Sequence, residues 1–304
     1  MKKVPGLSQG ERISKIFEAI SFLRKDFSVV LLCRVLGVSK GGYYAYLKRP
    51  KKVISDQDRK ILTKIKRAYT LHKGTYGAKR IAGYLKEKGT LVNHKKVARL
   101  MNEANIKAVV RRPKATKETK SQAAGYLYEN HLNRDFHANL PNKKWVTDMT
   151  EVLVDQEKFY ISALMDLFNR EVIAFKVSSS PNQELIKDTI VAAQKKRNLK
   201  SLDGVIIHSD QGSVYRSVSY NQLSKTLKFT PSMSRKANCW DNAVIESFFS
   251  QLKTEFPCFY SSIQKDTFQR DLKNFIQYYN EKRIQYKLGF VSPKKYYLDY
   301  QNAA

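Results

Sequence analysis

Residues 205–213 read VIIHSDQGS, and this stretch decides how the second half of the chain folds. Three β-branched apolar residues in succession are typical of a short central strand that is buried on both faces of a sheet. A polar run that contains Asp210 and Gly212 follows the strand at once. Because α/β sheets bind ligands at the carboxyl ends of their strands, we expect Asp210 to lie in a functional site.

The segments around this strand indicate a mixed α/β sheet. Apolar and alternating patterns predict five strands, at residues 144–154, 158–165, 172–177, 205–207 and 228–231. The first three follow one another closely, which suggests an antiparallel meander. An amphipathic helix at 183–197 precedes the central strand, and two long helices end the chain. The predicted fold class is therefore α/β, with a mixed five-stranded sheet and flanking helices.

Two further acids could join Asp210. Asp148 stands within the first strand among apolar neighbours, where an acid is unfavourable unless something compensates for it. An exposed position at the sheet edge is the alternative for Asp148. Glu246 shares a helix face with Asn242 and Lys253, opposite an apolar stripe. A solvated face with a weak ion pair is the alternative for Glu246.

Three carboxylates without a suitable cluster of His and Cys favour Mg²⁺ or Mn²⁺, because hard cations prefer oxygen ligands. Two such ions can activate an attacking oxygen and stabilise the leaving oxygen at phosphorus. Asp166, at the end of the second strand, is a competing acid. We interpret it as a hairpin-turn residue, and a role in the metal site is the alternative.

The chain is strongly basic, and the charge is concentrated in its first half. With 56 Lys and Arg residues against 27 Asp and Glu residues, the formal net charge is +29. Residues 1–137 alone hold 32 basic and 10 acidic residues. A polyanion is therefore the expected partner, with nucleic acid ahead of an acidic membrane surface.

Helical patterns divide the basic half into two segments and a linker. Residues 1–50 contain LGVS at 36–39, the turn pattern of a helix-turn-helix, although an ordinary helical hairpin is the alternative. Residues 51–106 predict a second helical DNA-binding segment, residues 107–137 a basic linker, and residues 138–304 the α/β domain. We expect phosphate contacts from Lys79, Arg80, Lys95, Lys96, Arg99, Arg111, Arg112 and Lys114.

Hydropathy and cysteine usage exclude several classes of protein. No run of about 18 apolar residues is present, so a membrane-spanning helix is not expected. The basic N-terminus lacks the apolar stretch of a secretion signal. Cys33, Cys239 and Cys258 form neither a disulfide framework nor a zinc-binding pattern. These features predict a cytoplasmic protein with reduced thiols.

Three motifs together resemble the retroviral-integrase-type catalytic core, and more closely the transposases of a bacterial insertion-sequence family whose second reading frame encodes this core. The motifs are WVTDMT at 145–150, HSDQGS at 208–213 and DNAVIESFF at 241–249. Asp210 and Glu246 are separated by 35 residues, the interval typical of this family. YYNEKR at 278–283 and, upstream, YGAKRI at 76–81 also fit the family.

The resemblance implies an RNase H-like fold and a DDE transposase. Asp148, Asp210 and Glu246 would bind two Mg²⁺ (or Mn²⁺) ions, and we assign Lys253 and Asn242 to DNA contacts. The activity would be phosphodiester cleavage and strand transfer at the terminal inverted repeats, which is DNA transposition with integration into target DNA. The protein would work as a homo-oligomer on the DNA of the bacterial nucleoid, with the product of the upstream reading frame as a further partner.

Two departures and two rival functions accompany this interpretation. Val214 and Ala237 differ from the residues that the family usually has in the loops beside the site. A regulator that binds DNA without catalysis would share the basic half of the chain. A metal-dependent nuclease that cuts but never joins DNA would share the acids.

Overall fold

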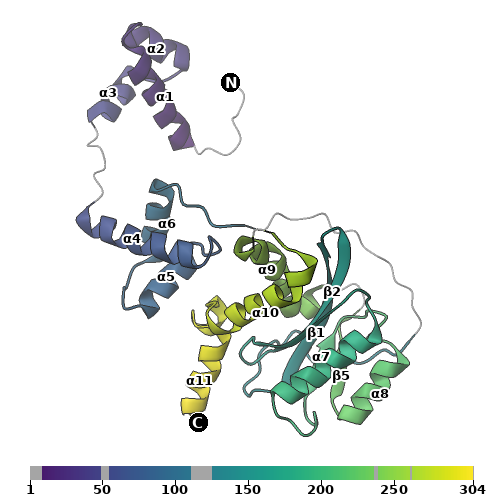
Figure 1. The fold of residues 1–304 in the computed structure, drawn as a ribbon. Helices are drawn as coiled ribbons and strands as arrows, with labels where there is room; N and C mark the ends of the chain where they lie inside the picture. The colour runs from purple at the N-terminus through teal and green to yellow at the C-terminus, as the bar shows by residue number, and fades with distance from the viewer. Residues whose placement is uncertain (1–8, 49–54, 111–124, 236–238, 261, 304) are drawn as a thin grey trace. The chain divides into compact units, whose positions relative to one another are not determined.

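The computed structural model describes residues 9–48, 55–110, 125–235, 239–260 and 262–303 (Figure 1). Contacts divide the chain into two units, which separate between Lys60 and Ile61. Each unit is described by itself below.

The first unit is a small bundle of three helices, α1 (Gln9–Leu23), α2 (Val29–Leu36) and α3 (Lys40–Lys48). Gly37 ends α2 in the left-handed conformation, with φ of +66°, which glycine adopts at little cost. The Ser39 hydroxyl accepts a hydrogen bond from the Gly42 backbone N–H at 3.0 Å and so caps α3. Both details confirm the predicted turn at 36–39. The helices close over a core of Phe17, Ile20, Leu32, Cys33 and Tyr43.

A second group of helices comprises α4 (Asp56–Leu71), within which the second unit begins, α5 (Ala78–Glu87) and α6 (His94–Glu103). Their shared core contains Ile65, Ile81 and Leu100, and it also contains Ile284 from near the end of the chain. These helices therefore pack against the C-terminal part of the same unit, and Figure 1 shows them beside α10 (Lys265–Glu281).

A single five-stranded sheet forms the centre of the second unit. Its strands are β1 (Lys144–Val154), β2 (Glu157–Asp166), β3 (Val172–Ser178), β4 (Ile206–Ser209) and β5 (Thr230–Met233), in the order β3-β2-β1-β4-β5. The first three strands form the predicted antiparallel meander, and β4 and β5 run parallel to β1. The predicted mixed sheet is confirmed.

The last strand lies two residues further along the chain than predicted. Lys228 adopts the left-handed conformation, with φ of +63°, and ends α8 (Val218–Leu227). A residue in this conformation cannot continue into extended backbone, so β5 begins only at Thr230. Its pairing with β4 then runs from Thr230 to Met233.

Helices cover both faces of the sheet, and alternate strand residues point to each side. Val146 faces a core shared with α9 (Ala243–Phe259) and α10, which contribute Phe248 and Leu272. Trp145 faces the other core, which is shared with α7 (Gln183–Lys196) and α8. One further helix, α11 (Pro293–Ala303), was not predicted from the sequence.

The α/β domain starts earlier than the predicted boundary at residue 138. The Tyr126 backbone N–H donates to the Arg216 carbonyl at 2.9 Å, and the His131 N–H donates to the Ser232 hydroxyl at 2.9 Å. Leu132 is buried in the core beside α9 and α10. The last part of the predicted linker, from about Tyr126 onward, is thus packed on the sheet domain. In the described part of the chain, no helix is long and apolar enough to span a bilayer.

A buried histidine lies where the helical group α4–α6 meets the C-terminal helices. His72 stacks on Tyr76 with ring centroids 3.8 Å apart, and its Nδ1 is 2.8 Å from the Tyr278 hydroxyl. Burial, followed by the positive charge of Arg283, lowers the pKa of His72 from 6.5 to about 4. The imidazole is therefore neutral in the folded protein at neutral pH.

This shift predicts an acid-sensitive fold. The unfolded chain binds a proton at residue 72 with a pKa near 6.5, whereas the folded chain binds it only near pH 4. The stabilisation is complete above pH 6.5 and is lost as the pH falls toward 4, by about 3 kcal/mol at most. Urea unfolding of wild type and His72→Gln at pH 7.5 and 4.2 should show a smaller acid loss in the variant. Equal losses would contradict this prediction.

Candidate active site

Asp210 lies at the carboxyl end of β4, where the central strand meets its loop. One carboxylate oxygen, Oδ1, accepts a hydrogen bond from the Gly212 backbone N–H at 2.9 Å. A Cβ atom at Gly212 would lie 2.9 Å from the same oxygen, so only glycine fits this turn without displacing the acid. Burial raises the pKa of Asp210, and the Gly212 hydrogen bond partly offsets the rise.

Asp148 lies beside Asp210 because of the register between the two strands. Val146 of β1 pairs with His208 of β4 in the parallel ladder. Asp148 lies two residues after Val146, and Asp210 lies two residues after His208. The pKa of Asp148 is raised well above its usual value, first by burial and then by the negative charges of Asp210 and Glu246. Asp148 and Asp210 therefore lie near enough to each other to interact electrostatically.

Glu246 projects from the first turn of α9. The other face of this helix buries Ile245, Phe248 and Phe249 against the sheet, which leaves Glu246 on the exposed side. Burial and the charge of Asp210 raise the pKa of Glu246. All three predicted acids therefore lie within electrostatic range of one another.

The three acids do not form a compact ligand cluster as they stand. Across the described residues, no group of three or more Asp, Glu, His or Cys side chains is close enough together to hold a metal ion. Mutual repulsion opposes the approach of like-charged carboxylates. Lys253, two turns after Glu246 on α9, offsets part of this repulsion, because its charge lowers the pKa of Asp148.

Asn242, which we assigned to DNA contacts, is not on the surface. It is 2% exposed, directly before α9, and among the described residues neither its amide nitrogen nor its oxygen has a hydrogen-bond partner. It is the last residue of the short 3₁₀ turn Cys239–Asn242, which immediately precedes α9. Asn242 is therefore not exposed for contact with DNA in this structure, and its assignment to DNA binding stays a prediction.

The competing acid Asp166 has a structural role in the turn after β2. It is fully buried, and its carboxylate accepts hydrogen bonds from the backbone N–H groups of Asn142 and Phe168, both at 3.0 Å. Its backbone carbonyl accepts from the Arg170 N–H at 2.8 Å. These contacts support the interpretation of Asp166 as a turn residue.

A buried acid that the sequence analysis did not single out holds the chain just before α9. The Asp241 carboxylate accepts hydrogen bonds from Arg235 Nε and Arg134 Nε, both at 2.9 Å, and from Asn130 Nδ2 at 3.0 Å. The hydrogen bonds from Arg235 hold its pKa well below the usual range. Asp241 was visible in the sequence only as a motif residue five positions before Glu246. It anchors the helix that carries Glu246.

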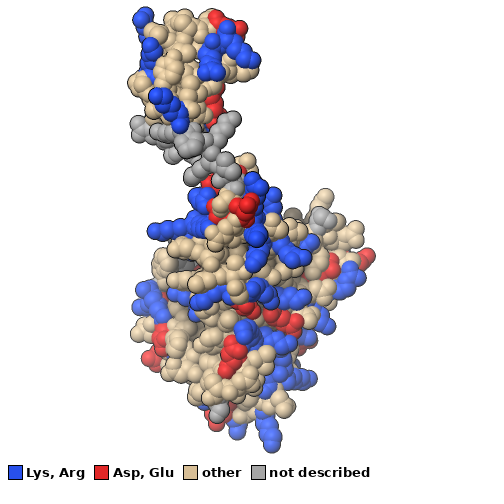
Figure 2. All heavy atoms as spheres, turned by 90° about the vertical axis from the view of Figure 1, so that its left-hand side faces the viewer, with Lys and Arg blue, Asp and Glu red and all other residues tan. Residues whose placement is uncertain are grey.

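The predicted DNA-contact residues fall into three groups. Lys79 and Lys95 are exposed on α5 and α6, and Lys96 and Arg99 are half-buried, with Arg99 paired to Glu103 at 3.0 Å. Arg80 points inward and pairs with Glu255 at 3.3 Å. The linker residues Arg111, Arg112 and Lys114 lie outside the described residues. Figure 2 shows Lys and Arg side chains spread widely over one face of the molecule.

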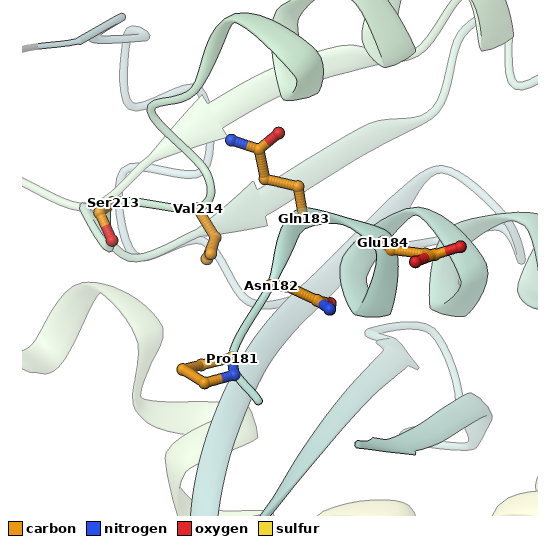
Figure 3. A pocket seen from close by; sticks show the side chains of 6 residues that line it. All are labelled: Pro181, Asn182, Gln183, Glu184, Ser213 and Val214. Carbon is orange, nitrogen blue, oxygen red and sulfur yellow. The ribbon is translucent and has the colours of Figure 1, made fainter. Parts of the chain in front are cut away.

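A hollow of about 580 Å³ lies next to the Asp210 loop. Residues 181–184 at the start of α7 line one side, and Ser213 and Val214 line the other (Figure 3). Val214, one of the two departures from the family pattern, thus lines this hollow. Ala237, the other departure, lies outside the described residues.

Comparisons with known proteins match the chain over both of its predicted functional regions. The integrase core domain family matches residues 138–239 and 227–293, and an HTH-like domain family matches residues 56–114. The putative transposase InsK for insertion sequence element IS150 of Escherichia coli is 36% identical over 92% of this chain and 96% of that protein. The transposase for insertion sequence element IS904 of Lactococcus lactis is 34% identical over 82% of this chain and 97% of that protein.

Among solved structures, the catalytic core domain of HTLV-2 integrase in complex with magnesium is 14% identical. The match covers 52% of this chain and 97% of that one, with a TM-score of 0.41.

Proposed function

Since the chain belongs to the insertion-sequence transposases that carry an integrase core domain, we propose that it is a DDE transposase which cuts and joins DNA at the ends of its element. The observation that carries the proposal is the strand register that sets Asp148 beside Asp210, with Glu246 close enough to raise the pKa of Asp148. Interacting carboxylates with raised pKa values are typical of catalytic sites.

The donor set fits divalent magnesium or manganese. Asp148, Asp210 and Glu246 offer only oxygen ligands, and the partial burial of Asp148 and Asp210 makes an uncompensated negative charge there costly. These three residues would hold two ions, which when bound supply Lewis-acid activation of the attacking oxygen and stabilisation of the leaving oxygen.

The protein's own residues position the substrate and the acids. Lys253 is an exposed ammonium near Asp148, and we assign it to a phosphate of the DNA end. Asp241 holds the start of α9, and Gly212 leaves room for the Asp210 carboxylate. A water molecule and then the freed 3′-hydroxyl would attack phosphodiesters in line, without a covalent link between protein and DNA.

DNA binding would come from the basic helices and the linker. Lys79, Lys95, Lys96 and Arg99 lie on helices within the matched HTH-like region, and the proposed ligands are the terminal inverted repeats of the element. Strand transfer needs two ends and a target, so we further propose a homo-oligomer on the DNA. The product of the upstream reading frame is a proposed partner, and the bacterial nucleoid is the proposed place of action.

A strand-transfer assay tests this function. Duplexes that carry the element's terminal repeats are incubated with the full chain and Mg²⁺, both uncut and with a preformed 3′-hydroxyl end. We expect cleavage of the first substrate and joining of both to a target plasmid. Cleavage without joining would identify a nuclease, and binding without cleavage a regulator, and either result would contradict the proposal.

The basic composition of the linker predicts that it adds DNA affinity without a preference for DNA sequence. Residues 107–120 contain six basic residues and one acid. Each lost phosphate contact should flatten the log–log dependence of affinity on salt by about 0.9. Replacing Arg111, Arg112 and Lys114 with Ala should therefore weaken binding to specific and nonspecific DNA alike. Gel-shift titrations at several salt concentrations measure the slope, and an unchanged slope would contradict the prediction.

A further inference from the structure

The helical group α4–α6 is joined to the helix of Glu246 by buried charges. Glu255 lies on α9, nine residues after Glu246, and its side chain is 9% exposed. Both of its oxygens pair with Arg283, at 2.7 Å from Nε and 2.7 Å from Nη2. Arg80 of α5 adds a third charge, with its Nη1 at 3.3 Å from Glu255. One carboxylate thus links α5, α9 and the segment after α10.

Neutral contacts surround this ion network and extend it into a continuous interface. The Tyr76 hydroxyl accepts a hydrogen bond from the Ile284 backbone N–H at 2.9 Å, and the Ile284 side chain lies within the core of α4–α6. Phe290 packs directly on Gly83 of α5, where an added Cβ would lie 2.5 Å from the ring. The fit therefore depends on the absence of a side chain at Gly83.

We expect such an interface to fix the position of α4–α6 relative to α9 more than it adds to the stability of the fold. A buried ion pair contributes little net stability because desolvation offsets its attraction, but it is costly to break and so can select one arrangement. Arg283 is 1% exposed and Arg80 is 27% exposed, so water offers these side chains few hydrogen bonds that could replace their pairing with Glu255. The α9 helix then connects Glu255 to Glu246 as a rigid element.

We infer that Arg80, Glu255 and Arg283 are positioning residues that hold the DNA-binding helices α4–α6 at a fixed offset from the catalytic acids. The inference rests on the proposed function. Its consequence is that the phosphodiester which is cut lies a set number of base pairs from the sequence that these helices bind. Arg80, which the sequence analysis assigned to a phosphate, acts instead within the protein.

The test is the position of the cut at single-nucleotide resolution. Arg80→Gln leaves the Arg283–Glu255 pair intact, so the buried charge stays balanced and we expect this variant to fold. Gly83→Ala displaces Phe290 from the other side of the interface without a change of charge. Arg67→Gln is the matched control, because Arg67 is exposed on α4 and its replacement removes one positive charge outside the network.

Wild type and the three variants are given the end-labelled terminal repeat with Mg²⁺, and the cut ends are mapped on a sequencing gel. Wild type and Arg67→Gln should cut at one position. Arg80→Gln and Gly83→Ala should spread the cuts over neighbouring phosphodiesters, with at least about a twofold loss at the main position, because small misplacements at a reacting centre are costly. DNA affinity should stay within the range of the control.

A single unchanged cut position in both interface variants would overturn the inference. The same holds if Arg80→Gln lowers DNA affinity more than Arg67→Gln and leaves the cut in place, because Arg80 would then be a phosphate contact. Failure of the wild type to cut at all would instead contradict the proposed function, so the two failures are distinguishable.

Discussion

Asp148→Asn, Asp210→Asn and Glu246→Gln should each lower cleavage and strand transfer by about a thousandfold or more, because residues that act as one unit lose nearly all activity when one of them is removed. Each change keeps the shape of the side chain and removes one negative charge from the proposed ion site. DNA affinity without metal should persist or rise, since a charge that repels phosphate is gone.

The control for these variants is Glu151→Gln, three residues after Asp148 on the same strand. Glu151 is exposed and pairs with the exposed Lys158 at 3.3 Å, so its loss should leave cleavage nearly unchanged. Gel shifts without metal and strand transfer with Mg²⁺ measure the two effects separately. Normal strand transfer by any of the three acid variants would refute the assignment of that acid.

Lys253→Ala should lower cleavage and joining by about ten- to a hundredfold, the range expected when one charged contact to a reacting phosphate is lost. An ammonium cannot ligate Mg²⁺, so the affinity of the free protein for metal should stay close to that of wild type. The structure places the Lys253 charge near Asp148, which is consistent with a phosphate held beside the acids.

Lys273→Ala is the control for Lys253→Ala, because Lys273 is an exposed lysine on the neighbouring helix α10. It removes the same charge away from the acids and should change strand transfer little. Metal binding is measured by titration with Mn²⁺. A loss of metal affinity by Lys253→Ala as large as that by Glu246→Gln would show that Lys253 supports the ion site itself.

Local patterns in the sequence were sufficient to predict most of the sheet. The meander and the central strand follow from apolar periodicity, and the end of α2 follows from Gly37. The start of β5 could not be predicted in this way, because Lys228 adopts the left-handed conformation and no glycine at this position indicates it. The helix α11 was missed although Tyr296, Tyr297 and Tyr300 stand at helical spacing; these side chains are partly buried against the core that contains Phe168.

The sequence was sufficient to propose the three acids, but it did not indicate the residues that support them. Asp148 and Asp210 are indicated by their places in strands, and the sheet register then sets them side by side. Arg80 and Glu255 are 175 residues apart in the chain, and only tertiary packing brings them together. A pattern of basic residues therefore suggests the same role for Arg80 and Lys79, although one faces the protein and the other faces water.

The most direct test of the central claim is to locate manganese in crystals of the chain bound to its terminal repeat, by anomalous diffraction. The account predicts manganese bound by oxygens of Asp148, Asp210 and Glu246, and loss of that density in crystals of Asp210→Asn. Manganese bound elsewhere, or density that persists unchanged in Asp210→Asn, would contradict it.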